Sequence, residues 1–216
     1  MNYFAHGRRH LQDPLVLAGT AVPDWLCVVD RRVRVTSRGA ARFLGAADSR
    51  VAAVAAGIVQ HHRDDDWFHG TSAFSELSSR FTLEARDFLG CEEGFRASFL
   101  GHILVEILLD AALIAEAPQR LEAYYRALES LDAEAVGQAV NHMATRRTEL
   151  LAPFIRLFCR ERFLYDYAED GKLLTRLNRV LQRVGLPALP QAFLGFLPAA
   201  RQCVERRARE LLDGHC

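Results

Sequence analysis

The amino-acid sequence predicts an all-α protein with a single helical domain of about eight to ten helices. Apolar residues recur every three or four positions over most of the chain, which is the period of a helix packed on one face. Only residues 28–35 approach the alternation of a strand, and Asp30 and three arginines interrupt it. Half of the 216 residues are hydrophobic and 25% are charged, as is usual for a globular domain with one sizeable core.

No internal repeat, low-complexity tract or long linker divides the chain. We therefore expect one domain over residues 1–216, in which residues 170–216 could pack as a C-terminal appendage. The predicted helices cover residues 13–30, 37–46, 49–69, 72–89, 93–117, 118–131, 132–148, 149–168, 171–185 and 190–213.

Several of these helix boundaries have a physical cause. Asp13 followed by Pro14 is typical of an N-cap and a first-turn proline. Asp132 begins a helix favourably, because a carboxylate is stabilised by the positive end of the helix dipole. Gly185 is expected to end one helix, since glycine adopts the left-handed conformation there at no steric cost, and Pro190 is expected to begin the last.

The overall composition argues against two classes of protein. Lys plus Arg and Asp plus Glu each total 27, so the formal net charge is zero, whereas general nucleic-acid binders rely on a basic surface. The apolar run at 99–115 includes three ionisable residues, so we expect a buried helix there and no membrane span. Five cysteines without a CxxC pair and no recognisable signal peptide favour free thiols and a cytosolic protein.

The predicted helix at 93–117 carries one polar stripe on an otherwise apolar surface. His102, Glu106 and Asp110 follow each other at four-residue intervals, which places their side chains along one face. A buried carboxylate without a partner costs several kcal/mol, so a positive group must face the stripe. A buried salt-bridge network would satisfy this requirement, and so would a metal ion. Asp110 drifts furthest around the helix and could lie at its rim or face Arg63 or Arg147.

A second stripe of the same kind lies in residues 61–69. His61, Asp65 and His69 repeat the four-residue spacing, and imidazole and carboxylate groups are ligands for zinc, manganese or iron. Asp64 or Asp66 could orient a ligand histidine through its second ring nitrogen. A solvated, charged helix end is the alternative. Two such stripes together favour one or two metal ions held between the helices.

Two N-terminal residues are further candidates for the same centre. Asp24 follows Pro23 in an apolar stretch, and His6 lies in the opening Asn-Tyr-Phe-Ala-His segment. Alternatively, Asp24 is the N-cap of a helix that begins near Trp25, and His6 is a surface histidine.

Five short motifs, in their order along the chain, resemble the acyl carrier protein phosphodiesterases, which are helical metal-dependent hydrolases with a distorted HD-type site. The resemblance covers roughly residues 1–185 and rests on residues 1–6, 19–25, 56–65, 102–110 and 143–147. It implies that His6, Asp24, His61 and Asp65 are metal-site positions and that Glu106 lies near the centre.

Three departures from that family are visible in this chain. His69 stands where the family has an acidic residue, the arrangement around 102–107 differs, and the segment between Asp24 and Gly57 is longer. The departures move the pattern towards the bacterial zinc-dependent phospholipases C, all-helical enzymes in which HxxxD and HxxxE motifs surround zinc. The spacing of His61/Asp65, His69 and His102/Glu106 is similar to theirs. Both groups hydrolyse phosphodiesters, so both resemblances imply the same chemistry.

We therefore expect a metal-dependent phosphoester hydrolase acting on a small-molecule or carrier-linked substrate. Asp65 would bridge two divalent ions about 3.5–4 Å apart, a bound water would attack the phosphorus, and Arg63 would add a fixed positive charge. The expected metal ligands are His6, Asp24, His61, Asp65, His69, His102 and Glu106.

Two other functions remain open from the residues alone. One is a helical interaction protein whose polar stripes are only a buried ion-pair network. The other is a di-iron oxidase, although such bundles use Glu-x-x-His motifs and additional glutamates, whereas this chain has His-x-x-x-Glu. The sequence leaves the oligomeric state, the metal identity and the membership of Asp110 and Arg147 in the site undetermined.

Overall fold

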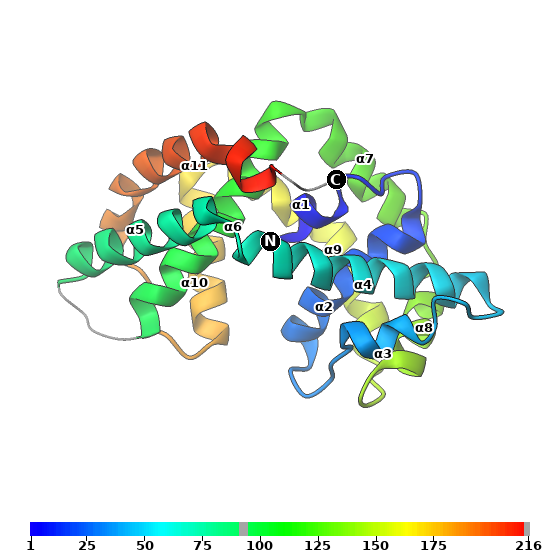
Figure 1. Cartoon of the computed structure of the whole chain (residues 1–216). Helices are drawn as coiled ribbons and strands as arrows, with labels where there is room; N and C mark the ends of the chain where they lie inside the picture. The colour runs from blue at the N-terminus through cyan, green and yellow to red at the C-terminus, as the bar shows by residue number, and fades with distance from the viewer. Residues whose placement is uncertain (91–94, 214–216) are drawn as a thin grey trace. The chain divides into compact units, whose positions relative to one another are not determined.

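The computed structural model describes residues 1–90 and 95–213, and every regular element in these ranges is a helix (Figure 1). The predicted all-α class is confirmed, with nine helices of seven residues or more in the described part of the chain. The elements are α1 (Tyr3–Gly7), α2 (Pro14–Val29), α3 (Ser37–Ala41), α4 (Ser49–His69), α5 (Ser72–Phe88), α6 (Phe95–Glu116), α7 (Pro118–Glu129), α8 (Ala133–Met143), α9 (Leu151–Glu161), η1 (Phe163–Ala168), α10 (Asp170–Arg183), η2 (Gln191–Gly195) and α11 (Leu197–Leu212).

The predicted helix boundaries are confirmed where capping chemistry is local. The side chain of Asp13 accepts a hydrogen bond from the Val16 amide, and that of Asp132 accepts from two amides in the first turn of α8. Gly185 follows α10 with a φ of 76°, a conformation that a side chain would strain. Residues 28–35 do not form the strand that their alternation suggested, because α2 continues to Val29 and an irregular segment follows.

Four predicted helices differ in extent from those observed, and the one expected at 132–148 ends at Met143. The expected helix at 149–168 is interrupted at Arg162, whose left-handed φ of 46° ends α9 before the 3-10 turn η1. The expected helix at 190–213 is divided into η2 and α11, and the helix expected at 37–46 ends at Ala41. The helix α1 was not predicted, since five residues are too few to show a period.

The chain folds into two compact units, each with its own internal packing. Unit 1 comprises Met1–Asn2, Trp67–Glu116 and Leu164–Cys216, and unit 2 comprises Tyr3–Asp66 and Ala117–Phe163. Each unit therefore combines segments that lie far apart in the sequence. The single domain over residues 1–216, with 170–216 as an appendage, stays a prediction.

Phe158 of α9 lies at the centre of an aromatic core in unit 2. Its ring contacts Trp25 at a centroid distance of 5.4 Å, Tyr125 at 5.8 Å and Tyr3 at 5.1 Å. All four side chains are less than 9% exposed, and aromatic groups of this size supply much of the burial energy of a core. Because Tyr3 belongs to α1, this core holds that short helix in place.

Two glycines allow α2 and α4 to cross at unusually short distance in unit 2. A Cβ atom added to Gly57 would lie 2.7 Å from the Gly19 Cα atom and 2.8 Å from the Thr20 nitrogen. Such distances are far below van der Waals contact, so any side chain at either position would force the helices apart. The crossing brings the backbone of Thr20 close to the turn of α4 that follows Gly57.

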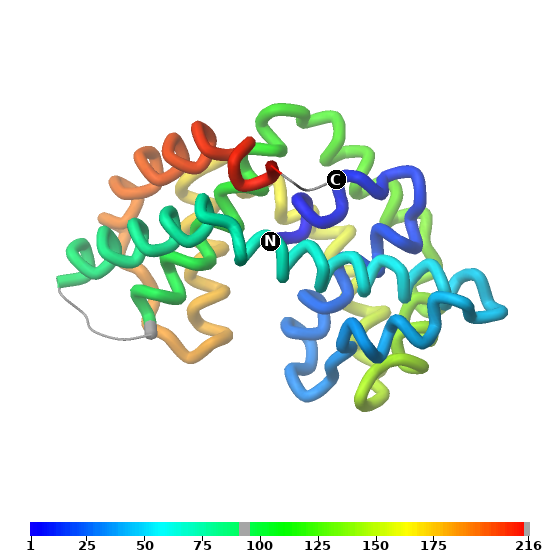
Figure 2. The backbone as a smooth tube through the Cα atoms, in the orientation of Figure 1, coloured from blue at the N-terminus to red at the C-terminus, as the bar shows by residue number. Residues whose placement is uncertain are grey.

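In unit 1, α5 packs extensively on α6, and α11 packs on both (Figure 2). Gly101 of α6 permits this approach, since an added Cβ would lie 2.8 Å from the Thr82 nitrogen. The segment Arg96–Glu116 of α6 is long and apolar enough to cross a membrane, with a mean hydropathy of 1.9, but 72% of its apolar window is buried. The absence of a membrane span stays a prediction.

Candidate metal centres

Two groups of metal-ligating side chains occur in the described residues, one in each unit. The first consists of His6, His61 and Asp65, and the second of His69, His102 and Glu106. Within each group, one ligand atom from every residue lies within 4.8 Å of the others. All six residues belong to the predicted ligand set. A single ion shared by the helices that carry His61 and His102 stays a prediction.

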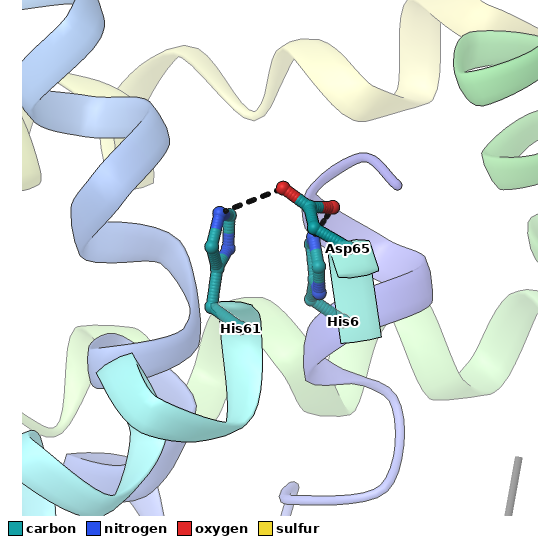
Figure 3. A group of neighbouring side chains, drawn as sticks. All are labelled: His6, His61 and Asp65. Carbon is teal, nitrogen blue, oxygen red and sulfur yellow. Dashed lines mark ion pairs between the residues drawn. The ribbon is translucent and has the colours of Figure 1, made fainter. Parts of the chain in front are cut away.

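In the first group, two stacked imidazole rings face one carboxylate (Figure 3). The rings of His6 and His61 are 4.1 Å apart and inclined by 26°. Nε2 of His6 lies 3.2 Å from Oδ1 of Asp65, and Nε2 of His61 lies 3.3 Å from Oδ2. Both histidines are buried, at 1% and 3% exposure, whereas 30% of the Asp65 side chain is exposed.

The second ring nitrogen of each histidine in this group faces an oxygen acceptor. Nδ1 of His6 lies 3.2 Å from Oδ2 of Asp64, and Nδ1 of His61 lies 2.8 Å from the carbonyl oxygen of Thr20. Since a carbonyl or ionised carboxylate only accepts, both Nδ1 atoms are donors. In the neutral rings, both Nε2 atoms then carry lone pairs. This is the arrangement that orients histidine ligands in metal sites.

The lone pairs and the carboxylate in this group favour a positive charge between them, either a proton on one ring or a metal ion. His6 Nε2 is buried without a hydrogen-bond partner among the described residues, although Asp65 lies within 3.2 Å. Protonating both rings would place like charges about 4 Å apart, which costs about 4 kcal/mol at an effective dielectric constant near 20. One divalent ion avoids this repulsion. Ligands about 2.0–2.2 Å from a tetrahedral ion lie about 3.3–3.6 Å apart, close to the observed distances.

The pKa shifts of His61 and Asp65 indicate the same preference for positive charge beside the carboxylate. Burial raises the pKa of Asp65, but its contacts with His6 and His61 outweigh burial and hold the pKa well below its usual range. Burial lowers the pKa of His61, but the Asp65 and Asp24 carboxylates outweigh it, so the pKa lies above its usual value. The group therefore favours an anionic carboxylate beside a cation.

A pocket of about 460 Å³ opens beside the first group, entirely within unit 2. Asp24, His61 and Asp65 line it, together with residues of the segment that follows α2. Asp24 lies inside α2, so its alternative interpretation as an N-cap is wrong. The alternative of a surface position for His6 is also wrong, because the residue is buried. Asp24 lines the same pocket but is not one of the three grouped residues, so its place among the metal ligands stays a prediction.

The second group, in unit 1, is built differently. The Nε2 atoms of His69 and His102 both lie close to Oε1 of Glu106, at 3.0 and 3.1 Å, with hydrogen-bond geometry. The Met1 amino group lies 3.4 Å from the same oxygen. Burial raises the pKa of Glu106, but the amino group and the two histidines outweigh burial and hold the pKa well below its usual range. Glu106 thus has positive or donating partners without an ion.

The remaining predicted residues take varied positions. Arg63 is exposed on α4, two residues from both His61 and Asp65 and so about half a turn around the helix from each. Asp110 is fully buried, so the expectation of a rim position is wrong. Burial raises the pKa of Tyr167, and the charge of Asp110 adds to this effect. Arg147 is exposed in the irregular segment after α8.

Some residues that build the first group were not singled out from the sequence. The Thr20 carbonyl orients His61, but a backbone acceptor leaves no signature in side-chain spacing. Asp64 was one of two alternatives, and only its burial at 2% exposure distinguishes it from the exposed Asp66. Gly19 and Gly57 were parts of the resembling motifs, and their spacing from Asp24 and His61 could have indicated a close helix crossing.

Comparisons with known proteins leave the geometry as the main guide to function. No protein family, curated protein or solved structure matches the chain. Each described group contains one carboxylate, whereas the di-iron bundles have several glutamates around two ions. The structure therefore supports an all-helical protein with two candidate metal sites.

Proposed function

We propose that this protein is a metal-dependent phosphoester hydrolase whose centre is formed by His6, His61 and Asp65. The observation that carries the proposal is the convergence of two imidazoles, each with Nδ1 facing an acceptor, on one carboxylate at the wall of a pocket. Three protein ligands with an open position are typical of catalytic metal sites, whereas structural sites usually have four.

Each residue of this centre has a distinct task in the proposal. His6 and His61 supply neutral nitrogen ligands, and Asp65 supplies one or two oxygens. Asp24 of α2 adds negative charge at the pocket wall and leaves one position of the ion open. Asp64 and the Thr20 carbonyl position the rings. A divalent ion held by such ligands supplies Lewis acidity, which makes water a nucleophile near neutral pH and offsets charge on a phosphoryl group.

The size of the pocket beside the centre is evidence for a small substrate. Its volume of about 460 Å³ lies within the range of small-molecule sites, which is about 300–1,000 Å³. The phosphoester part of the proposal is supported by the resemblance of the motifs around His6, Asp24, His61 and Asp65 to two groups of phosphodiester hydrolases. The substrate is a small-molecule or carrier-linked phosphoester in the cytosol, and Zn, Mn or Fe is the expected metal.

Hydrolysis assays test this function directly. Bis-p-nitrophenyl phosphate and p-nitrophenyl phosphate are compared with Zn²⁺, Mn²⁺ or Fe²⁺ added to chelator-treated protein. We expect turnover of at least one ester that is lost in His61→Ala and retained in His142→Ala, since His142 is exposed and lies outside both groups. Turnover that is equal in the two variants would contradict the proposal.

A second candidate function is a helical interaction protein stabilised by buried ion pairs. The observation that favours it is the second group, where Glu106 already accepts from His69 and His102. If this function is correct, chelator leaves the melting temperature of the purified protein unchanged, because no bound ion contributes to stability.

A further inference from the structure

Among the described residues that line the pocket beside His6, His61 and Asp65, Arg34 is the one arginine or lysine. Resting on the proposed function, we propose that Arg34 binds the substrate phosphate opposite the metal ligands. The substrate class is then a phosphate ester with a compact, largely apolar organic group.

The backbone of Arg34 is held firmly although its side chain is exposed. Its amide donates to the Thr145 hydroxyl at 3.2 Å, and its carbonyl accepts from the Thr145 amide at 2.9 Å. The neighbouring residues Val33 and Val35 are buried at 2% and 4% exposure. The Arg34 backbone is thus a fixed point on the pocket wall.

A hydrogen bond joins the Arg34 segment to the helix that carries the first metal group. Nε2 of His62 on α4 lies 2.9 Å from the carbonyl oxygen of Val35. His62 follows His61 in sequence and Val35 follows Arg34, so this bond ties the arginine to the wall that holds His61. All of these residues belong to unit 2.

The charges that line the pocket explain why an arginine is needed there. Asp24 and Asp65 make one wall acidic, and an anion approaches it only when positive charge is supplied. A divalent ion offsets that wall, and Arg34 adds a planar fork of donors that matches two phosphoryl oxygens. Exposed Arg63, on another face of α4, is not among the lining residues and does not take this role.

The rest of the lining indicates the organic part of the ester. Leu26, Val33 and Val35 contribute apolar surface, together with Pro23. Such a mixture binds a small apolar group, while a few polar groups set its orientation. The p-nitrophenyl group has this character, so the simple aryl esters are suitable probes.

Arg34→Ala tests the inference, with Arg32→Ala as its matched control. The Arg32 side chain is 78% exposed, pairs with Asp30 and does not line the pocket. Binding of inorganic phosphate to the metal-loaded protein is measured by calorimetry, beside metal content and KM for p-nitrophenyl phosphate. Because a hydrogen bond to a charged group is lost, we expect Arg34→Ala to raise the phosphate Kd and the KM about ten-fold. Metal content should stay unchanged.

Arg34→Lys should recover only part of the phosphate affinity, and Arg32→Ala should match the unmodified protein. Phosphate binding that is equally tight in Arg34→Ala would overturn the inference, even if esters are hydrolysed. Conversely, weaker phosphate binding in Arg34→Ala without turnover of either ester would support the phosphate pocket and contradict the hydrolase. Circular dichroism and melting curves establish that each variant is folded.

Discussion

Gly57 of α4 lies against Gly19 of α2 so closely that a Cβ atom on Gly57 would be 2.7 Å from the Gly19 Cα atom. This contact sets the distance between the two helices one turn of α4 before His61. His61 lies one turn after Gly57, and its Nδ1 atom reaches the carbonyl oxygen of Thr20, the residue after Gly19. Helix packing and ligand orientation therefore depend on the same crossing.

Gly57→Ala should destabilise the protein and weaken metal binding together. The added methyl group meets backbone atoms, which costs about 1–3 kcal/mol, while the gain in helix propensity is at most about 1 kcal/mol. We expect a melting temperature lower by a few degrees. Gly171→Ala in α10 is the control, because nothing lies within 4 Å of its added Cβ. Equal stability of the two variants would contradict the close crossing.

Metal removal should lower the melting temperature of the unmodified protein. An ion present at about 100 times its Kd stabilises the folded state by about 2.7 kcal/mol. His6→Ala and His61→Ala should lose the tightly bound ion and with it the effect of chelator, whereas His142→Ala should keep both. Elemental analysis and melting with and without chelator provide the measurements. Less than about 0.3 equivalents of metal, unchanged in His61→Ala, would exclude this centre.

Measurements of bound metal also distinguish the second group from the first. Since Glu106 already accepts from two histidines, we expect His102→Ala to retain the tight ion that His61→Ala loses. A metal titration of chelator-treated protein resolves the two sites. Loss of the tight ion in His102→Ala would instead assign it to the second group.

Asp64→Asn should weaken metal binding without unfolding the protein. Asp64 accepts hydrogen bonds from Nδ1 of His6 and, at 2.6 Å, from the side-chain amide of Gln60. Asparagine carries no charge, so in this variant His6 loses the anionic partner that makes it a better metal ligand. Changes of this kind typically reduce metal affinity about 10–100-fold. Asp66→Asn, close in sequence but exposed, is the control and should bind metal normally. Competition with a chromophoric chelator measures both affinities.

The stability that Glu106 contributes should disappear in acid. Its folded pKa is lowered, despite burial, by the Met1 amino group and the two histidines. A carboxylate with a lowered pKa stabilises the folded state above its unfolded value, here 4.5, and loses this effect as the pH falls towards the folded pKa. In chelator-treated protein, Glu106→Gln should therefore melt below the unmodified chain at pH 7, and the difference should shrink below about pH 4.5.

Glu116→Gln is the control for this experiment, because Glu116 is exposed at the end of α6. Its melting temperature should follow that of the unmodified protein at every pH. If the Glu106→Gln difference is independent of pH, the lowered pKa is not the source of the stability.

Much of the candidate site could be predicted because helices convert sequence spacing into shared faces. The pairs His61/Asp65 and His102/Glu106 are each four residues apart, and each pair meets in the folded chain. What spacing could not indicate is which distant residue completes each pair. The ring contact between Tyr3 and Phe158 holds α1 in the position where His6 contacts Asp65. His69, at the end of α4, contacts Glu106.

The sequence by itself determined the helical class, most helix boundaries and the set of residues able to bind metal, because periodicity, capping and ligand chemistry are local properties. Only the tertiary structure decided that these residues form two groups and that Asp64 orients His6. It also decided that Asp24 lies inside a helix at a pocket wall. These outcomes depend on burial and on contacts between distant segments, such as the Gly19–Gly57 crossing, which no local pattern specifies.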